Sequence, residues 1–311
     1  MRENLVACFG EPLIGFYESK DDQNEYKKFY LTIGGDTSNV ALQLSKFNIP
    51  VKFITKIGND VFGEIILKIW KEWDIDVTDV NISENFQTGI YFTFFENKIT
   101  HRFIYKRENS ASSNYTIYDA KKANLEGLKI FHLSSISQAI SKNCLEASFI
   151  FLEECKKRNI MISYDANYRK LLWSENFYKS VATHTIKNFV DILSINIEEA
   201  SIILDKDLST EEIVKTLLDF GPKIVALKLG EKGGFIGNKD KIVYGKPYYV
   251  EVVDTVGAGD AFTASVIFGV LNNWNIEKII DFANYCASSV CKSVGSTVGQ
   301  LKFNDIKKFF E

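Results

Sequence analysis

One segment near the end of the chain combines glycines, an acidic residue and a helix start in a way that suits phosphoryl transfer. In VVDTVGAGDAFTASVIFGVL, residues 252–271, the pattern predicts a strand end, a turn with Gly257 and Gly259, and an apolar helix. Glycines let the backbone approach a ligand closely, and the unpaired N–H groups at a helix start favour an anion. Asp260 lies in the first helical turn, where it could accept a proton from a hydroxyl while the amides hold a phosphoryl group. The alternative is an ordinary helix N-terminus, in which Asp260 only stabilises the first turn.

Three further segments place polar groups beside helix starts or strand ends. Gly34 and Gly35 precede a predicted helix, so the backbone there either approaches a polar ligand or forms only a tight loop. Asn196 and Glu199 stand three apart at the start of another predicted helix, so their oxygens face the same way and could hold a hydrated Mg²⁺. Lys228 ends a predicted strand before the glycine-rich hairpin KLGEKGG, where it is either a phosphate contact or a solvated charge. The chain contains no Walker pattern, GxxxxGK[ST], and GAGD lacks the third glycine of a dinucleotide fingerprint.

The composition argues against several other classes of function. Lys and Arg number 37 and Asp and Glu 40, a formal net charge of −3, which disfavours a protein that coats nucleic acid. Because the chain has three histidines, a zinc site with several His ligands is disfavoured, and we expect carboxylates to carry out acid–base chemistry. The five cysteines form no CxxC pair and predict reduced, mostly buried thiols. The apolar run AFTASVIFGVL is too short to span a bilayer, so we expect a cytoplasmic protein without a membrane partner.

The chemistry-bearing residues need a scaffold that brings distant segments together. Apolar strand-like runs alternate with helical ones along the 311 residues, which predicts a doubly wound, mostly parallel α/β sheet with helices on both faces. In such sheets, ligands bind beyond the carboxyl ends of the strands. The strand-like runs are residues 5–10, 51–58, 128–135, 160–167, 190–196 and 223–230. Clear helical runs are 38–48, with Ser38 or Asn39 near the cap, 60–73 and 141–159.

Two regions break this alternation. Residues about 12–34 and 88–107 are rich in Thr, Ile, Phe and Tyr and look like antiparallel strands, the second with a hairpin turn at ENK, residues 96–98. Because a small sheet is not stable alone, we expect it to pack on the core, to cover a cleft as a lid, or to pair with another subunit. Apolar faces on its strands predict a homo-oligomer assembled through them.

The two glycine segments, about 220 residues apart, resemble in sequence and order the signature regions of the ribokinase-like (PfkB) carbohydrate kinases. The stretches that carry the resemblance are GGDTSNVALQL and DTVGAGDAF, with NIEE and KLGEKGG between them similar to the family's magnesium-site and nucleotide-site segments. The resemblance covers nearly the whole chain and implies one ribokinase-like domain over residues 1–311, with a β-lid from about 12–34 and 88–107. It implies ATP and Mg²⁺ as cofactors, Asp260 as the catalytic base, and an anion hole at Gly257, Ala258 and Gly259. It also implies ATP contacts at Asn196, Lys228, Gly230, Gly233, Gly257 and Gly259, and Mg²⁺ held through water by Asn196 and Glu199.

Within that family, the middle of the chain is most similar to 2-keto-3-deoxygluconate kinases. The segments concerned are GEPL (10–13), TGIYF (88–92), YKRENSAS (105–112), FHLSSI (131–136) and YDANYRKLLWS (164–174). The resemblance implies a sugar-acid site lined by Gly35, Asn39, Tyr91, Tyr105, Arg107, Arg169 and Asp260. Arginine binds a carboxylate through two parallel hydrogen bonds, so Arg107 and Arg169 suit an acidic substrate; the alternative is that both form surface ion pairs.

Gly15 supports the same interpretation. Ribokinases and fructokinases usually carry an Asp at this place, in a GExxID-like pattern, whereas this chain reads GEPLIG. Without that carboxylate a neutral sugar loses a hydroxyl acceptor, and an anionic sugar loses a repulsion. We therefore expect ATP-dependent phosphorylation of the terminal hydroxyl of 2-dehydro-3-deoxy-D-gluconate. The alternatives are a fructokinase or another sugar or sugar-acid kinase of the family and, outside the enzymes, a non-catalytic sugar-binding regulator.

Overall fold

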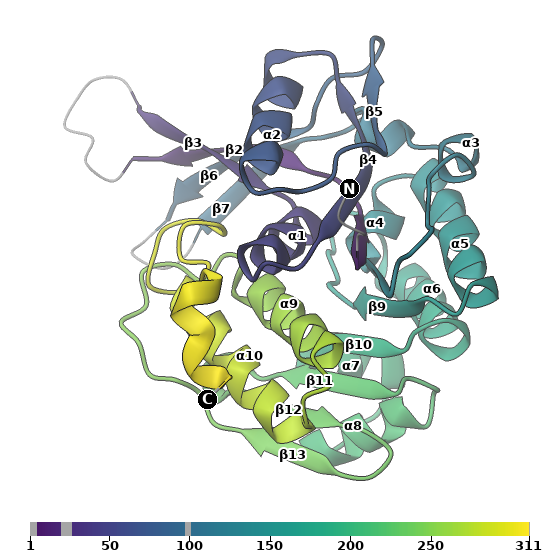
Figure 1. The fold of residues 1–311 in the computed structure, drawn as a ribbon, viewed down its shortest axis with the longest axis vertical. Coiled ribbons are helices and arrows are strands. Elements are labelled where there is room, and N and C mark those ends of the chain that lie inside the picture. The colour runs from purple at the N-terminus through teal and green to yellow at the C-terminus, as the bar shows by residue number, and fades with distance from the viewer. Residues whose placement is uncertain (1–4, 20–26, 97–100, 311) are drawn as a thin grey trace.

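A computed structural model describes residues 5–19, 27–96 and 101–310 and shows a large sheet covered by helices, with a small sheet projecting at one side (Figure 1). The proposed turn at ENK includes Asn97 and Lys98, which lie outside the described residues, as does part of the segment 12–34. Among the described residues, no helix is both long and apolar enough to cross a membrane. All five cysteines are described and unpaired, and all but the half-buried Cys291 are buried.

The large sheet provides the edge at which the site lies. Within the described residues it has nine strands in the order β13-β12-β11-β10-β9-β8-β1-β4-β5. Neighbours from β11 to β5 run parallel, and β11, β12 and β13 are joined by antiparallel pairing at the other edge. The strands are β1 (Val6–Phe9), β4 (Val51–Gly58), β5 (Val80–Ser83), β8 (Ile130–Ser134), β9 (Met161–Asp165), β10 (Ile192–Asn196), β11 (Ile224–Lys228), β12 (Gly234–Gly237) and β13 (Ile242–Gly245).

Helices cover both faces of this sheet because its strands carry apolar side chains on both sides. One face packs on α1 (Asp36–Lys46), α2 (Val61–Glu72), α9 (Ala258–Leu271) and α10 (Ile276–Val290). The other face packs on α5 (Lys142–Lys157), α6 (Glu175–Asn188), α7 (Ile197–Leu204) and α8 (Thr210–Leu218), with short α3 (Ile117–Ala120) and α4 (Ser135–Ala139) nearby. Short 3₁₀ turns are η1 (Ser112–Asn114), η2 (Gly230–Lys232) and η3 (Phe303–Phe309).

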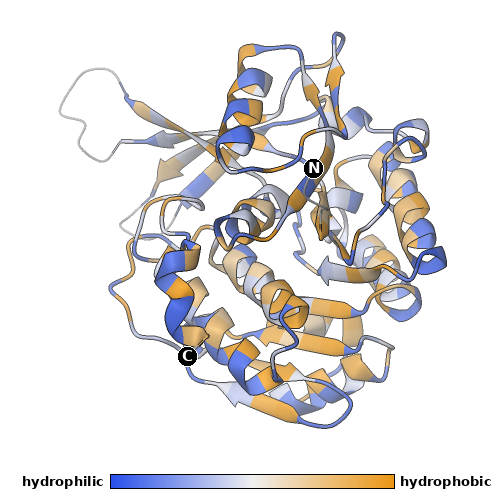
Figure 2. Ribbon diagram, viewed as in Figure 1, coloured by the Kyte–Doolittle hydropathy of each residue, from blue (hydrophilic) through white to orange (hydrophobic). Residues whose placement is uncertain are grey.

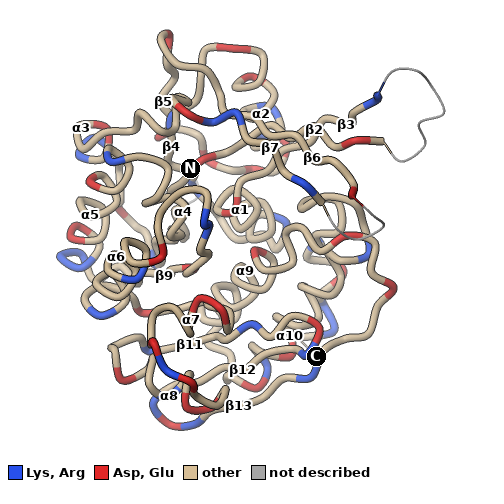
Figure 3. Tube along the Cα trace, turned by 180° about the vertical axis from the view of Figure 1, so that it is seen from behind, with Lys and Arg blue, Asp and Glu red and all other residues tan. Residues whose placement is uncertain are grey.

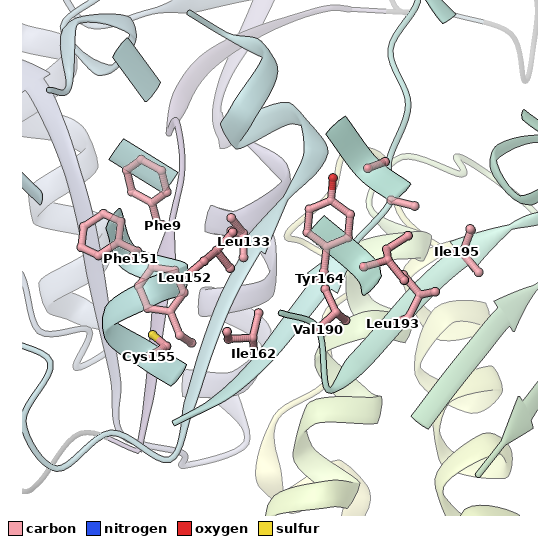
Figure 4. Close-up of a cluster of buried hydrophobic side chains, with 14 of the residues drawn as sticks. Phe9, Leu133, Phe151, Leu152, Cys155, Ile162, Tyr164, Val190, Leu193 and Ile195 are labelled. Atoms are coloured by element: carbon pink, nitrogen blue, oxygen red, sulfur yellow. The ribbon is translucent and has the colours of Figure 1, made fainter. Parts of the chain in front are cut away.

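The two apolar cores follow the alternation of side chains along the strands. In β1, Ala7 and Phe9 enter one core while Val6 and Cys8 enter the other. Figure 4 shows part of the first, with Phe9, Phe151 and Ile162 packed between the sheet and α5. Strands at the centre of the sheet are largely apolar in Figure 2, and Figure 3 shows acidic and basic residues interspersed along the trace. The predicted fold class, a mostly parallel sheet flanked by helices with a smaller separate sheet, is confirmed.

The small sheet joins the two segments that interrupt the α/β pattern. Its described strands have the order β3-β2-β6-β7, with β2 (Leu13–Glu18), β3 (Phe29–Gly34), β6 (Ile90–Phe95) and β7 (His101–Lys106). Each segment forms an antiparallel pair, as expected, and the two pairs are joined by a parallel β2–β6 pairing, for which there was no prediction. This pairing can be parallel because β2 and β6 belong to different insertions, so no tight turn joins them. A role as a lid remains a prediction.

The start of α1 differs from its predicted cap. Gly35, and neither Ser38 nor Asn39, is the N-cap, and the helix begins at Asp36. Gly35 has φ 101°, and a Cβ there would collide with the carbonyl oxygen of Glu11. This close approach of two backbones requires glycine. As a result, Asp36 and Asn39 fall in the first helical turn, facing the site.

Candidate active site

A cavity of about 690 Å³ lies at the carboxyl ends of the large-sheet strands, next to the small sheet. It gathers residues that are far apart in the sequence. Those predicted from the sequence are Gly35, Asn39, Tyr91, Tyr105, Arg107, Arg169, Asn196, Glu199, Lys228, Gly230, Gly257, Gly259 and Asp260. The remaining two, Gly233 and Ala258, line an adjoining cavity of about 710 Å³ that shares Lys228, Gly230 and Gly259 with the first. A larger hollow of about 880 Å³ beside Trp73 contains none of the predicted residues.

The loop before α9 is held by hydrogen bonds to the C-terminal segment. Residues 252–254 do not form the predicted strand end: Val253 N–H donates to the carbonyl of Cys291 at 2.8 Å, beyond the end of α10. The buried Asp254 carboxylate accepts from Val256 N–H at 3.0 Å and from Gly295 N–H at 2.8 Å. Gly257 then caps α9 with φ 83°, and a Cβ there would press against Ser296. Asp254 thus fixes the loop from which the helix-start amides project.

Asp260, in the first turn of α9, is held by a hydrogen-bond chain. Asn39 Nδ2 donates to Asp260 Oδ2 at 2.7 Å, and Ser296 Oγ donates to Asn39 Oδ1 at 2.9 Å. Burial, assisted by the negative charge of Asp36, raises the pKa of Asp260 to about 7, although the Asn39 hydrogen bond opposes the rise. A carboxylate with such a pKa is a stronger base than an ordinary aspartate and is still ionised at neutral pH to a large extent.

Lys228 forms an ion pair with Asp165, which neither of the two roles predicted for Lys228 included. At the end of β11, its Nζ donates to both carboxylate oxygens of Asp165, at 2.8 and 2.9 Å, and Asp165 lies at the end of β9. Thr263 Oγ1 from α9 also donates to Asp165, at 2.8 Å. Burial lowers the pKa of Lys228, but the carboxylates of Asp165 and Glu199 outweigh it and raise the pKa above its usual value. Lys228 therefore stays charged beside Gly259.

Asn196 and Glu199 cap α7 reciprocally. Asn196 Oδ1 accepts from Glu199 N–H, and Glu199 Oε2 accepts from Asn196 N–H, each at 2.9 Å. Glu199 Oε1 accepts from Tyr168 N–H at 3.1 Å, and burial raises the pKa of this carboxyl while Lys228 opposes the rise. In the described part of the chain, no group of three or more His, Cys, Asp or Glu is arranged to hold a metal. One carboxylate and one amide at the cavity wall fit a Mg²⁺ ion that keeps most of its water.

The side of the cavity next to the small sheet is aromatic and contains the two predicted arginines. Tyr91 and Tyr105 face the cavity from β6 and β7. Arg107 forms an ion pair with the nearly fully buried Glu11, and its guanidinium lies 5.5 Å from the centre of the Tyr105 ring. Arg169 is exposed, and its Nη1 donates to the Tyr168 carbonyl at 3.1 Å. Among the described residues, Arg107 has an acidic partner and Arg169 has none.

Tyr91 also explains the glycine at position 15. A Cβ on Gly15 would overlap the Tyr91 ring, and a Cβ on Gly34 would lie 2.6 Å from the Tyr91 hydroxyl. Both glycines therefore make room for this tyrosine. Burial raises the pKa of Tyr91 well above its usual value, so its hydroxyl remains protonated and can donate a hydrogen bond.

Several polar residues of the cavity were not identified from the sequence. Asp36 Oδ2 accepts from Asn167 Nδ2 at 3.0 Å, and both side chains line the wall. Asp36 directly follows Gly34 and Gly35, which was an available signal. The others are Glu11, Asp165, Thr255 and Ser296. Asp165 was also accessible, because the ends of neighbouring parallel strands meet at one edge of a sheet.

Known proteins are similar to this chain along nearly its whole length. The model of the pfkB family of carbohydrate kinases matches residues 3–302. The ATP-dependent 6-phosphofructokinase of Thermoanaerobacterium thermosaccharolyticum is 28% identical over 312 residues, covering 98% of this chain and 94% of that protein. The 5-dehydro-2-deoxygluconokinase of Clostridium perfringens is 26% identical, covering 93% and 86%. The crystal structure of a 2-dehydro-3-deoxygluconokinase from Thermotoga maritima has the same fold, with a TM-score of 0.90, 23% identity, and coverage of 99% and 98%. This protein therefore belongs to the pfkB family of carbohydrate kinases and is a sugar kinase.

Proposed function

We propose that the protein transfers the γ-phosphoryl group of ATP to the terminal (6-) hydroxyl of 2-dehydro-3-deoxy-D-gluconate, giving the 6-phosphate and ADP. The observation that carries the choice of substrate is the exposed Arg169 at the cavity wall, without an acidic partner among the described residues. A guanidinium so placed matches a carboxylate. The absence of a carboxylate at Gly15 agrees with an anionic ligand, and the name of the Thermotoga maritima structure agrees with this substrate.

In the proposed reaction, Asp260 is the general base. The sugar oxygen attacks the γ-phosphorus, the bond from that phosphorus to the β–γ bridging oxygen breaks, and ADP leaves with the electron pair. The hydroxyl proton passes to Asp260 as the new O–P bond forms, since even a carboxylate of pKa about 7 is too weak to remove it beforehand. The amides of Gly257, Ala258 and Gly259 neutralise the charge on the phosphoryl oxygens, and positioning lowers most of the barrier.

We propose that the nucleotide lies across the two adjoining cavities. Lys228 and Gly230 lie in both, so they are suited to contact the phosphates, while Gly233 lies further along the second cavity, where the rest of ATP would extend. Asn196 and Glu199 are proposed to hold Mg²⁺ through water in the first cavity, which Lys228 also lines. Held there by Asn196 and Glu199, Mg²⁺ would supply positive charge that offsets the negative charge of the phosphates.

The sugar acid is placed between the small sheet and α1. Tyr91 and Tyr105 supply hydroxyls, Gly35 allows close backbone approach, and Arg169 binds the carboxylate with Arg107 beside it. Asn39 also lines the cavity, but because it donates a hydrogen bond to Asp260, its main proposed role is to orient this base. The small sheet acts as the lid in this arrangement.

One observation favours a second candidate, a fructokinase or another kinase of a neutral sugar. Arg107 is already neutralised by Glu11, so the site offers one uncompensated guanidinium instead of two. A sugar without a carboxylate could use the oxygens of Glu11 and Asp36 as hydroxyl acceptors.

The outer face of the small sheet supports a homo-oligomer formed through the lid strands. Phe16 and Phe92 stack there with centroids 5.1 Å apart, Phe29 packs against Phe94, and Leu31 is 45% exposed beside them. Light scattering of wild-type protein and of Leu31→Lys tests this, because a charge on the face should dissociate the oligomer. We also propose a cytoplasmic location, because the reducing environment there would keep the unpaired cysteines reduced.

ADP release measured over a panel of sugars tests the function. The panel contains 2-dehydro-3-deoxy-D-gluconate, gluconate, fructose, ribose and inosine, each with ATP and Mg²⁺. We expect the highest kcat/KM with the 2-keto-3-deoxy acid. Higher kcat/KM with fructose would replace the proposal by the second candidate, and binding without ADP release would indicate a sugar-binding regulator.

A further inference from the structure

A histidine of the small sheet lies against the loop that leads into α9. His101 Nε2, at the start of β7, is 3.6 Å from Asp254 Oδ1, and both side chains are almost completely buried, at 4% and 0% exposure. Within residues 5–19, 27–96 and 101–310, this Nε2 has no hydrogen-bond partner. A buried polar atom without a partner costs free energy and requires a reason.

Asp254 is the brace of the loop that carries the anion hole. Its two oxygens accept the N–H groups of Val256 and Gly295, so it ties the residue before Gly257 to the C-terminal segment. Any shift of this carboxylate moves the Gly257–Gly259 amides with it. The contact with His101 connects the small sheet, through Asp254, to the loop that carries these amides.

The face of β7 that contacts Asp254 also borders the sugar side of the cavity. Residues that alternate along a strand share one face, and His101, Phe103 and Tyr105 do so. Phe103 and Tyr105 line the cavity, and the His101 ring packs between Phe95 and Phe103, with centroids 4.8 and 6.1 Å away. A movement of β7 on sugar binding would therefore also change the distance between His101 and Asp254.

We propose that His101 is a positioning residue that couples sugar binding to the anion hole. With a sugar beneath the small sheet, His101 Nε2–H donates to Asp254 Oδ1, and the Asp254 brace then sets the Gly257–Gly259 amides. Closing from 3.6 Å to the usual 2.9 Å of such a bond requires a movement of less than about 1 Å. The inference rests on the proposed roles of Asp260 and the anion hole, but not on the identity of the sugar.

The test compares three variants with the wild type. His101→Ala removes the donor, His101→Gln keeps an N–H near the position of Nε2, and Arg102→Ala is a matched control on the exposed face of the same strand. We measure kcat and KM with the most active sugar of the panel, and amide hydrogen exchange of residues 252–260 without ligand, with 2-dehydro-3-deoxy-D-gluconate and with fructose. His101→Ala should lower kcat by about 10- to 100-fold, with little change in the KM for ATP or in the KM for the sugar. It should also lose the sugar-dependent protection of residues 252–260, whereas His101→Gln and Arg102→Ala keep both.

Each other outcome overturns the inference. Wild-type kcat in His101→Ala, or an equal loss in His101→Gln, removes the role of the Nε2–H donor. Equal loosening of residues 252–260 in Arg102→Ala shows a merely structural effect of the strand. If the wild type releases ADP with no sugar of the panel, the failure belongs to the proposed function. Sugar-dependent exchange, which needs binding but not turnover, then decides: if adding either sugar protects residues 252–260 as much in His101→Ala as in the wild type, or protects them in neither, the coupling is contradicted.

Discussion

The main cavity has two halves that are built differently. The inner half, around Asp260 and Lys228, is formed by strand ends and the start of α9, and its charged groups have fixed partners: Asn39 holds Asp260, and Asp165 holds Lys228. The outer half, around Tyr91, Tyr105, Arg107 and Arg169, is formed by the small sheet and a loop, and Arg169 is exposed. The inner half belongs to the packed core of the α/β domain. The outer half rests on strands that are buried on one face.

In the proposed function, this difference separates the groups that transfer the phosphoryl group from those that select the sugar. A preorganised inner half can transfer a phosphoryl group to any hydroxyl delivered to Asp260. We propose that the outer half selects the sugar, through a few side chains that can change without disturbing the core. It is consistent with this division that relatives with differently named sugar substrates align along nearly the whole chain.

The largest expected effect comes from removing the proposed base of the inner half. Asp260→Asn should lower kcat by about 100- to 10,000-fold, because the amide cannot accept the hydroxyl proton. Sugar binding, measured by calorimetry, should stay near wild type, and the exposed Asp207→Asn is the matched control. Near-normal turnover in Asp260→Asn would refute the assignment of the base.

A second change breaks the ion pair of the inner half. Lys228→Met should lower kcat/KM for ATP by about 100-fold and destabilise the fold by about 3 kcal/mol, because it leaves the Asp165 carboxylate buried without its cation. Adding Asp165→Asn should recover much of the stability, measured by urea unfolding, but not the activity. Recovery of both would mean that Lys228 has a structural role alone.

The outer half is tested by removing its exposed guanidinium. Arg169→Leu should raise KM for sugar acids by about 10- to 100-fold, the loss of a charge-assisted hydrogen bond, and change fructose kinetics little. Its neighbour Lys170→Leu, also exposed, controls for loss of a positive charge on this loop. Equal losses for acidic and neutral sugars would contradict the carboxylate assignment.

The pH dependence of the inner half follows from the raised pKa of Asp260. Because the base must be ionised, kcat/KM should fall about tenfold per pH unit below about pH 7. Asp36→Asn removes a negative charge that raises this pKa, so it should move the acidic limb of the profile to lower pH. A limb near pH 4 in the wild type would mean that Asp260 is not perturbed.

The smallest effect concerns stability. A carboxyl group whose pKa is higher in the folded than in the unfolded state stabilises the fold below about pH 4, and this stabilisation is lost as the pH rises through about 7. Asp260→Asn should therefore raise the melting temperature by a few degrees at pH 8, and by less at pH 5. An equal gain at both pH values would argue against the linkage. If the melting temperature rises as expected, the inactive variant is more stable than the wild type at pH 8, as expected where activity and stability compete.

For the inner half, local sequence patterns predicted the strands and turns but did not predict which side chains contact one another. The apolar strand runs and the turn at Gly257 were predictable because their signals lie within a few neighbouring residues. The partners of Lys228 and Asp254 were not, since they lie 63 and 41 residues away in the sequence. Residues 252–254 looked like a strand because Val-Val is equally suited to an extended segment that bonds to the end of α10. Gly35 replaced the expected polar cap because the approach of another backbone outweighed capping preference.

In the outer half, residue types were informative but pairings were not. Arg107 lines the cavity, yet its ion pair with Glu11 joins two distant segments of the chain, which no local pattern records. The resemblance to sugar-acid kinases identified positions that line the cavity, and their roles there remain to be tested by the variants above.

The Tyr91 ring over Gly15 constrains how this site could have diverged from a neutral-sugar site. A carboxylate at position 15 and a tyrosine at position 91 compete for the same space, so neither can be exchanged without the other. Introducing Asp at Gly15 alone would displace the ring, and replacing Tyr91 alone would leave a void without gaining a hydroxyl acceptor. The two positions are therefore epistatic. If the outer half selects the sugar as proposed, we expect a change of sugar class by this route to require substitutions at both positions.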